Sequence, residues 1–270
     1  MNKPYVAASS YLNTAPLCYS FIHGRQRDRC SFLSDAAPSR CADLLADGTA
    51  DAALIPVIEY QRIPGLRVAR GACVSSRSSV RSVVLASKVP IDRIRRVTLD
   101  ISSRTSAALV RIILSEFYRI SPEYDVASPR IDRMLESSDA ALIIGDPAML
   151  IDRSALQVYD LAEEWRKHTG LPFVFAFWAI RDNARNWPGK ASTDAIDFEA
   201  AKREGLENLL NIVEAYSKTL GLPAPDLTTY LTQNICFDLE PDCFDAIGLY
   251  YRLAYKAKLI DGLNELRFED

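Results

Sequence analysis

The feature that most constrains this chain is a regular alternation of strand-like and helix-like stretches from its start to about residue 181. The strand-like stretches are short apolar runs, whereas the helix-like stretches carry apolar residues at the spacing of a helical face. The long helix expected at 102–120 follows this rule between residues 110 and 117. Such alternation favours an α/β fold with parallel strands. Strands are expected at 4–9, 30–35, 50–57, 67–76, 79–88, 95–100, 123–128, 139–146 and 171–181, and only helices from about residue 194.

The sequence Asp-Ala-Ala-Leu-Ile occurs twice, at 51–55 and at 139–143, each time after a short helix and a turn. Two lobes of similar build explain this better than a repeat array does. We expect residues 1–86 and 179–270 to form one discontinuous lobe, which includes the C-terminal helices, and residues 87–178 to form the other. The extended segments Ser82–Lys88 and Phe173–Arg181 are expected to join the lobes, with a ligand cleft between them. Residues 181–193 are the most linker-like stretch.

The composition limits the kinds of molecule that the protein can be expected to bind. Of the 270 residues, 49% are hydrophobic and 25% charged, and the formal net charge is −3. A nucleic-acid surface usually needs a basic excess, whereas a local pocket can still hold a small anion. The N-terminal segment lacks the long apolar core of a secretion signal, and no apolar run approaches the ~18 residues of a membrane span. We expect a cytoplasmic protein with a small-molecule substrate. The sequence does not decide whether the protein forms a homodimer.

The cysteines and histidines do not form a metal-binding pattern. None of the six cysteines forms a C-x-x-C pair, and His23 and His168 are isolated in the sequence, whereas zinc ligands are usually closely spaced. The chain also lacks a G-x-G-x-x-G fingerprint, a phosphate-binding P-loop, a G-x-S-x-G elbow and an H-E-x-x-H helix. The sequence therefore predicts neither a metal nor an organic cofactor.

Residues 10–17 read SYLNTAPL and follow the first predicted strand directly. Asn13 and Thr14 stand where the next helix begins, with Pro16 just inside it. One interpretation is a helix cap, because Asn and Thr cap helices well and Pro suits the first turn. The other is a binding site, because open α/β sheets bind ligands at the carboxyl ends of their strands.

A second candidate is the hydroxyl-rich segment at 102–106, which starts the long helix. Free N–H groups and the helix dipole make such an end suitable for a carboxylate or phosphate. Capping alone needs one hydroxyl, but four are present, and both interpretations stay open. They are Ser102, Ser103, Thr105 and Ser106.

Two further loops end predicted strands, at 55–60 and 145–149, and if the lobes face each other we expect these four loops to meet in the cleft. Asp100 and Asp146 end strands as well, and each is either a catalytic carboxylate or a helix cap. Glu59 and Tyr60 are expected on the surface. Trp165 and Trp178 are expected to pack in the core rather than to stack on a substrate.

Six segments together resemble the chorismate dehydratase family of the futalosine route to menaquinone. They read SYLNTAPL, DAALIPVIEY, SVRSVVL, LDISSRTSAAL, DAALIIGDPAM and TGLPFVFAFWA, and the resemblance runs from Tyr5 to Arg181. A sister family, the 1,4-dihydroxy-6-naphthoate synthases, typically opens with Pro-Asn-Asp-Thr and uses a His that has no counterpart in these loops. This chain departs from its relatives at Ser78 and Ser79, where they often carry Gly-Pro, and at Ala162, where they tend to have Gly.

The resemblance implies the two-lobed fold of type II periplasmic binding proteins, used here as an enzyme. It implies a dehydratase, a carbon–oxygen lyase that removes water from chorismate to give 3-[(1-carboxyvinyl)oxy]benzoate without a cofactor. Asn13 and Asp146 are the expected catalytic residues. The expected substrate-binding residues are Tyr11, Thr14, Pro56, Ser82, Ser103, Thr105, Ser106 and Gly145.

The cleft loops offer no histidine and no close acidic pair, which leaves Asp146 as the only protein carboxylate to nominate as a base. Chorismate carries a carboxylate on its enolpyruvyl arm, and our hypothesis is that this group takes the ring proton. Asn13 would then hold the departing hydroxyl or an adjacent carboxylate, with help from Thr14. The alternatives are the sister synthase and a cytosolic solute-binding or sensor module of the same fold.

Overall fold

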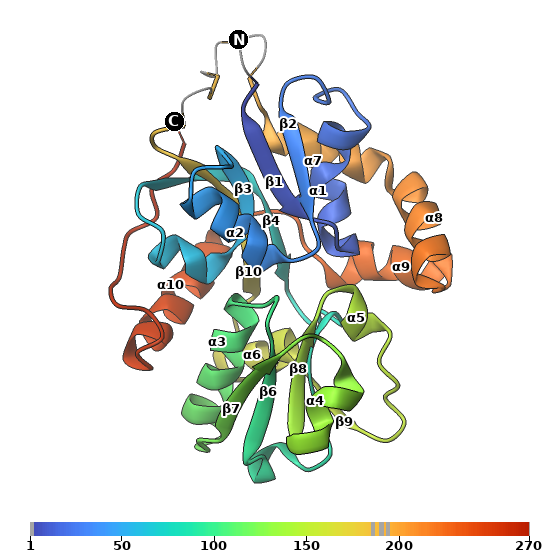
Figure 1. The fold of residues 1–270 in the computed structure, drawn as a ribbon, viewed down its shortest axis with the longest axis vertical. Coiled ribbons are helices and arrows are strands. Elements are labelled where there is room, and N and C mark those ends of the chain that lie inside the picture. Colours follow the sequence, from blue (N-terminus) through green and yellow to red (C-terminus); the bar gives the residue numbers. More distant parts are fainter. Residues whose placement is uncertain (1–2, 185–186, 189–191, 193–194, 270) are drawn as a thin grey trace.

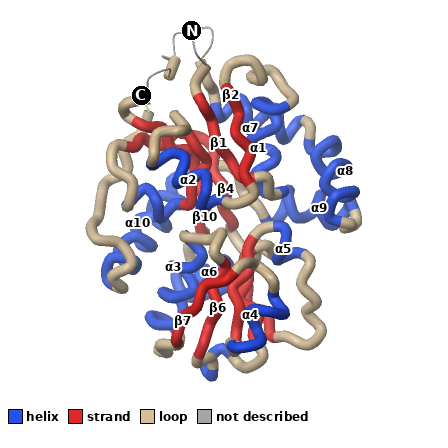
Figure 2. The backbone as a smooth tube through the Cα atoms, viewed as in Figure 1, coloured by secondary structure: helices blue, strands red, loops and turns tan. Residues whose placement is uncertain are grey.

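The computed structural model describes residues 3–184, 187–188, 192 and 195–269 and shows two lobes, one above the other (Figure 1). Each lobe contains a five-stranded sheet with helices packed around it (Figure 2). Within the described residues, no helix is long and apolar enough to cross a membrane. The expected linker at 181–193 lies partly outside these residues.

The first sheet belongs to the upper lobe of Figure 1 and has the strand order β2-β1-β3-β10-β4. Helix α1 (Ala15–Ile22) links β1 to β2, and α2 (Pro38–Ala46) links β2 to β3, so these three strands run parallel. The strands are β1 (Tyr5–Ser9), β2 (Ser31–Asp35), β3 (Ala52–Pro56), β4 (Leu66–Ser76) and β10 (Phe173–Arg181).

The second sheet repeats this plan with the order β7-β6-β8-β5-β9. Helix α3 (Thr105–Ile112), extended by a π-helical turn at Ile113–Phe117, connects β6 to β7, and α4 (Ile131–Ser137) connects β7 to β8. Helices α5 (Asp146–Met149) and α6 (Leu161–Thr169) follow strands β8 and β9. The strands are β5 (Val83–Ser87), β6 (Arg96–Asp100), β7 (Glu123–Ala127), β8 (Ala140–Ile144) and β9 (Gln157–Asp160).

The expected parallel strands form in both sheets, but each sheet is mixed rather than purely parallel. Strand β10 is antiparallel to both β3 and β4, and β5 is antiparallel to both β8 and β9. Neighbouring parallel strands need a crossover connection, usually a helix. Strands β5 and β10 have no such crossover: each enters its sheet from the other lobe and runs in the opposite direction.

Because of these two strands, the junctions between the lobes lie at other residues than expected. Strand β5 lies entirely in the second sheet and β10 entirely in the first, so neither Ser82–Lys88 nor Phe173–Arg181 spans the gap. The chain passes between the sheets at 77–82 and again at 170–172. We therefore propose that the lobe boundaries fall within these two passages rather than at 86/87 and 178/179.

The C-terminal part of the described chain is helical, as expected, and its helices lie against the first lobe (Figure 1). Helix α10 also contacts the second lobe, because the Tyr250 hydroxyl donates to the backbone carbonyl of Thr105 at 2.9 Å. The helices are α7 (Phe198–Glu207), α8 (Leu209–Leu220), α9 (Ala224–Thr229), continued by a π-helical turn at Tyr230–Asn234, and α10 (Pro241–Lys256).

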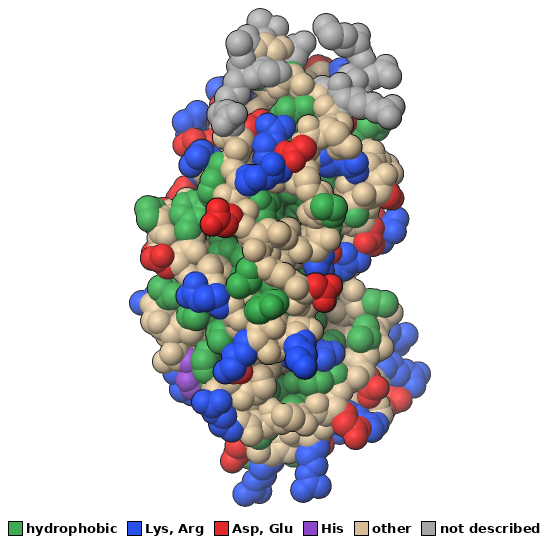
Figure 3. Space-filling view, turned by 90° about the vertical axis from the view of Figure 1, so that its left-hand side faces the viewer, with side chains coloured by type: hydrophobic (Ala, Val, Ile, Leu, Met, Phe, Trp, Pro, Cys, Tyr) green, Lys and Arg blue, Asp and Glu red, His purple; other side chains and the backbone are tan. Residues whose placement is uncertain are grey.

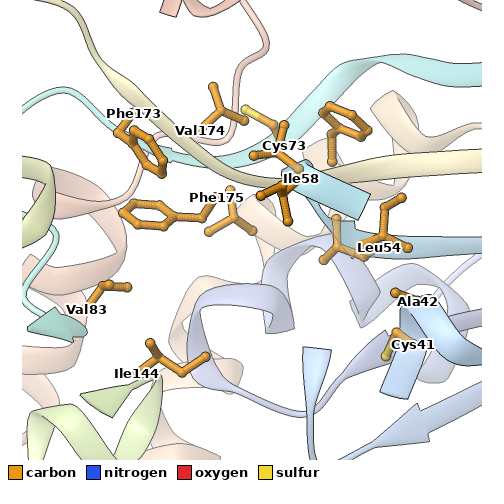
Figure 4. Close-up of a cluster of buried hydrophobic side chains, with 14 of the residues drawn as sticks. Cys41, Ala42, Leu54, Ile58, Cys73, Val83, Ile144, Phe173, Val174 and Phe175 are labelled. Atoms are coloured by element: carbon orange, nitrogen blue, oxygen red, sulfur yellow. The ribbon is translucent and has the colours of Figure 1, made fainter. Parts of the chain in front are cut away.

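The core is continuous from one lobe to the other. Both Asp-Ala-Ala-Leu-Ile segments enter strands that are buried throughout, and Trp165 and Trp178 are fully buried packing residues, as expected. Figure 4 shows Phe175 of β10 between Val83 and Ile144 of the second lobe and Ile58 of the first. Apolar contact therefore holds the lobes together near the passages.

Gly205 allows α7 to pack directly on the start of α1. A Cβ atom at this position would lie 1.8 Å from the backbone oxygen of Pro16. Gly205→Ala should therefore push the two helices apart and lower the free energy of unfolding by about 1–3 kcal/mol or more, measured by urea denaturation. Gly248→Ala is the matched control, since its nearest neighbour is a flexible arginine tip at 3.4 Å, and Ala should raise helix stability by roughly 0.5–1 kcal/mol. Equal stability of the two variants would contradict this packing.

Candidate active site

A cavity of about 50 Å³, measured as the space open to the centre of a water molecule, lies between the lobes. The four loops expected to meet there do so, because each follows the carboxyl end of a strand that points toward the cavity. The predicted residues that line it are Tyr11, Asn13, Thr14, Pro56, Ser103, Thr105, Ser106 and Gly145. Ser82 and Asp146 are not part of this lining and lie behind it, where they hold the loops.

The loop at 11–14 does not act as a helix cap. Neither the short 3-10 helix at Leu12–Thr14 nor α1 receives a side-chain cap. The Thr14 hydroxyl instead contacts the backbone carbonyls of Ser9, at 2.6 Å, and Tyr11, at 2.8 Å. Thr14 therefore fixes the turn, while Asn13 lines the cavity.

Asp146 does not cap its own helix either. The cap position of α5 is Gly145, with a φ of +66°, and the Asp146 Oδ1 atom accepts a hydrogen bond at 2.9 Å from the backbone N–H of Leu12. The bond crosses from the second lobe to the first and holds the residue next to Asn13. Burial raises the pKa of the Asp146 carboxyl to about 6, although the Leu12 hydrogen bond opposes this shift.

Gly145 and Tyr11 form a second contact across the cavity. A Cβ atom on Gly145 would lie 2.5 Å from the Tyr11 ring, so only glycine lets the ring approach the backbone so closely, and the positive φ also favours glycine. The Tyr11 hydroxyl and the Ser102 Oγ atom lie 3.4 Å apart. Tyr11 therefore spans the cavity between two loops of the second lobe.

The hydroxyl groups of the segment at 102–106 make different contacts. The Ser103 Oγ atom accepts from the backbone N–H of Ser106 at 3.2 Å and so caps the helix, and the Ser102 hydroxyl donates to Asp100 at 2.6 Å. The Thr105 Oγ1 atom accepts from the backbone N–H of Ile58 at 3.4 Å. Capping thus uses one hydroxyl, as expected, and Thr105 and Ser106 remain beside the cavity at the helix start.

Asp100 is a structural residue. Its Oδ1 atom accepts from the backbone N–H and the hydroxyl of Ser102, and its Oδ2 atom accepts from the backbone N–H of Ile144 at 3.2 Å. Only 1% of the residue is exposed. The carboxylate therefore joins the ends of β6 and β8 and does not face the cavity.

Arg104 is a cavity-lining residue that sequence reasoning missed. Its guanidinium donates to Glu59 Oε2 at 2.7 Å and to Asp43 Oδ1 at 2.6 Å, and both carboxylates belong to the first lobe. Arg62 pairs with Glu59 as well, and Arg40 with Asp43. These five residues, the ion-pair cluster, carry one net positive charge, because three arginines face two carboxylates.

The expected surface positions of Glu59 and Tyr60 are wrong. The residues are only 3% and 4% exposed. Glu59 is buried between two arginines, and Tyr60 packs edge-on against Phe177 and donates a hydrogen bond to the backbone of Glu265 at 3.0 Å. Local sequence could reveal only the i,i+3 spacing of Glu59 and Arg62; the partners from distant segments have no local signal.

Charge is otherwise sparse around the cavity. Arg104 is the single charged side chain in its lining as far as the structure is described. Lysine, arginine and acidic side chains are intermixed on the face shown in Figure 3, which has no continuous basic surface. Among the described residues, no three His, Cys, Asp or Glu side chains are grouped to hold a metal ion. The site offers hydroxyls, an amide and backbone N–H groups.

The fold and the cavity between two lobes define the periplasmic-binding-protein class. A crystal structure of an Archaeoglobus fulgidus protein matches with a TM-score of 0.73 at 18% identity, covering 96% of this chain and 98% of that one. The periplasmic aliphatic sulphonate binding protein SsuA of Escherichia coli gives a TM-score of 0.65 at 15% identity, covering 100% and 94%. This confirms the fold that the sequence predicts.

Within this class the chain belongs to a menaquinone biosynthesis family, whose sequence model matches residues 4–256. The chorismate dehydratase of Thermus thermophilus is 31% identical over 268 residues, which cover 92% of this chain and 93% of that protein. The match to the family model therefore extends beyond Arg181 into the C-terminal helices, where the sequence contains no distinctive motif of the family.

Removing the Arg104 guanidinium should loosen the closed arrangement of the lobes. Arg104→Gln gives up two charge-assisted bonds, each contributing about 1.5–3 kcal/mol, so the closed-to-open ratio should fall at least about tenfold. Small-angle scattering without ligand should then show a larger radius of gyration than for the wild type. Arg62→Gln is the matched control, because Arg62 pairs with Glu59 within the first lobe. Equal radii for Arg104→Gln and Arg62→Gln would contradict a role for Arg104 across the cavity.

The raised pKa of Asp146 predicts a specific pH dependence of stability. Between about pH 4 and pH 6 the folded state keeps a proton that the unfolded chain releases, so the free energy of unfolding falls as pH rises. The cost is at most roughly 3 kcal/mol. Asp146→Asn cannot ionise, and its stability relative to the wild type should increase from pH 4 to pH 7 in urea titrations.

Asp261→Asn is the control for this series, because Asp261 is an exposed loop carboxylate. Its stability difference from the wild type should stay flat over the same range. A flat difference for Asp146→Asn as well would show that Asp146 ionises normally in the folded protein.

Proposed function

We propose that this protein is a chorismate dehydratase of menaquinone biosynthesis, which acts in the cytoplasm as a hydro-lyase and needs no metal or organic cofactor. The reaction converts chorismate to 3-[(1-carboxyvinyl)oxy]benzoate and water. The observation that carries this proposal is the 31% identity to the Thermus thermophilus chorismate dehydratase over 92% of this chain and 93% of that protein.

The geometry supports a dianionic substrate in a protein of net negative charge. The start of α3 lines the cavity, where a helix N-terminus can provide backbone N–H groups to an anion and where Thr105 and Ser106 add neutral donors. The ion-pair cluster carries one net positive charge in all and meets the cavity at Arg104. A carboxylate can therefore be held beside α3 without a free lysine or arginine.

The proposed elimination needs no atoms or electrons from outside the substrate. The ring C–H bond next to the hydroxyl-bearing carbon breaks, its electrons enter the ring, and the hydroxide that leaves combines with the released proton to form water. Aromatisation drives the reaction, so positioning matters more than a strong acid or base. Asn13 lines the cavity and, in this proposal, holds the departing hydroxyl or an adjacent carboxylate.

The proposed base is the carboxylate of the substrate's enolpyruvyl arm. Asp146 is the nearest rival, and burial gives its carboxyl a pKa of about 6, suitable for a base. Its Oδ1 atom is already hydrogen-bonded to Leu12, however, and the side chain is not part of the cavity lining. Asp146 is better suited to hold the loop that carries Asn13.

The test is to mix chelator-treated protein with chorismate and follow the aromatic product by absorbance and mass spectrometry. Asn13→Ala should lower turnover at least about tenfold, the scale of one lost polar contact in a site, whereas Asp146→Asn should keep measurable turnover. Binding of chorismate without product would identify a solute-binding or sensor module instead. Conversion of a different substrate only would favour the sister synthase. An inactive Asp146→Asn that binds chorismate normally would make Asp146 the base.

A further inference from the structure

Helix α10 carries two adjacent buried tyrosines whose hydroxyls reach cavity walls from different lobes. The Tyr250 hydroxyl donates to the backbone carbonyl of Thr105, at the start of α3 in the second lobe, at 2.9 Å. The Tyr251 hydroxyl donates to the backbone carbonyl of Val57, which follows Pro56 in the first lobe, at 2.6 Å. Both Thr105 and Pro56 line the cavity. A C-terminal helix therefore holds one wall of the cavity from each lobe.

The two walls are also joined to each other directly. The backbone N–H of Ile58 donates to the Thr105 Oγ1 atom at 3.4 Å. A hydrogen bond of this length is weak by itself, so the distance between the walls depends on the two tyrosines that hold them. Because Ile58 follows Val57 and Tyr251 follows Tyr250, the three bonds close a ring through both lobes and α10.

The position of the Tyr250 hydroxyl is fixed by the packing of its ring. The residue is buried, and its ring packs edge-on against Phe173, which begins β10, and Trp165 of α6. The ring centroids lie 5.2 Å and 6.3 Å away, respectively. A buried tyrosine hydroxyl needs a hydrogen-bond partner, and the Thr105 carbonyl is that partner. The packed ring therefore sets where the hydroxyl lies, and the hydroxyl holds the first residue of α3.

Thr105 offers a hydrogen-bond donor from this held position. Its Oγ1 atom accepts from the backbone N–H of Ile58, and a threonine hydroxyl has one hydrogen of its own to donate. Thr105 lines the cavity, and a neutral donor at a helix start suits a carboxylate. A shift of the Thr105 backbone would move this donor away from a bound carboxylate.

We propose that Tyr250 is a positioning residue for substrate binding: it holds Thr105 at the distance from the first lobe that a substrate carboxylate requires. The inference rests on the proposed function and extends it to a helix outside the four cavity loops. Tyr250 is not part of the cavity lining, and the proposed contact to the departing hydroxyl belongs to Asn13 on another loop. Loss of the Tyr250 hydroxyl therefore weakens binding of substrate and transition state equally, which raises KM and leaves kcat unchanged.

Tyr250→Phe tests this inference, because it removes only the hydroxyl and keeps the buried ring. We expect KM for chorismate to rise about three- to tenfold, the range of one neutral hydrogen bond, with kcat within about twofold of the wild type. Tyr60→Phe is the matched control, a buried tyrosine whose hydroxyl donates to the Glu265 carbonyl at 3.0 Å, outside the cavity. It should keep both constants, and melting temperatures of both variants report any general loss of stability.

The double variant Thr105→Val, Tyr250→Phe shows whether Tyr250 acts through Thr105. If it does, the double variant should have the same KM as Thr105→Val alone. Multiplying effects, an unimpaired Thr105→Val, or an unchanged KM in Tyr250→Phe would overturn the inference, and the proposed function would stand as long as the wild type converts chorismate. A wild-type protein that does not convert chorismate would overturn the proposed function and this inference with it.

Discussion

The contact on which the site depends is the hydrogen bond from the backbone N–H of Leu12 to the buried carboxylate of Asp146. It joins a loop of one lobe to a helix start of the other, and Asn13 is the next residue along that loop. A buried carboxylate needs a partner, because burial without one costs several kcal/mol. The lobes thus satisfy each other's polar groups, and the cavity exists in this closed form because they do. Arg104 has the same function on the opposite side of the cavity, where it pairs with Asp43 and Glu59.

These contacts bear on the proposed function, which requires a protein of net charge −3 to hold an anionic substrate. The ion-pair cluster keeps its carboxylates engaged with arginines, so their charge is compensated before a substrate arrives. The start of α3 then supplies partial positive charge through backbone N–H groups, which need no counterion. Ser103 caps the helix, and Thr105 and Ser106 stay beside the cavity. If the substrate binds there as proposed, binding and closure would be connected, because the residue between Ser103 and Thr105 is the arginine that pairs with the first lobe.

Much of this arrangement could be predicted from local sequence. The strands expected from apolar runs all form, and the loops predicted to meet at their carboxyl ends do line one cavity, which includes Asn13 and Ser106. The errors have a common origin. Glu59 was expected on the surface because its neighbours along the chain do not bury it; Arg104 from the other lobe does. Mixed strand direction was missed because apolar runs report burial and not direction.

The sequence by itself determined which segments form buried strands, that helices alternate with them, and which polar residues follow the strands, because these properties depend on neighbours within a few residues. Only the tertiary structure decided which groups meet across the cavity. Leu12 and Asp146 are 134 residues apart in the chain, and Ser82 and Tyr230 are 148 apart. Contacts at such separations form only when the lobes dock and the C-terminal helices pack behind them, and no local pattern records the resulting geometry. From the sequence, Asp146 was therefore either a catalytic carboxylate or a helix cap, and Tyr230 was not singled out, until the docked lobes gave each its partner.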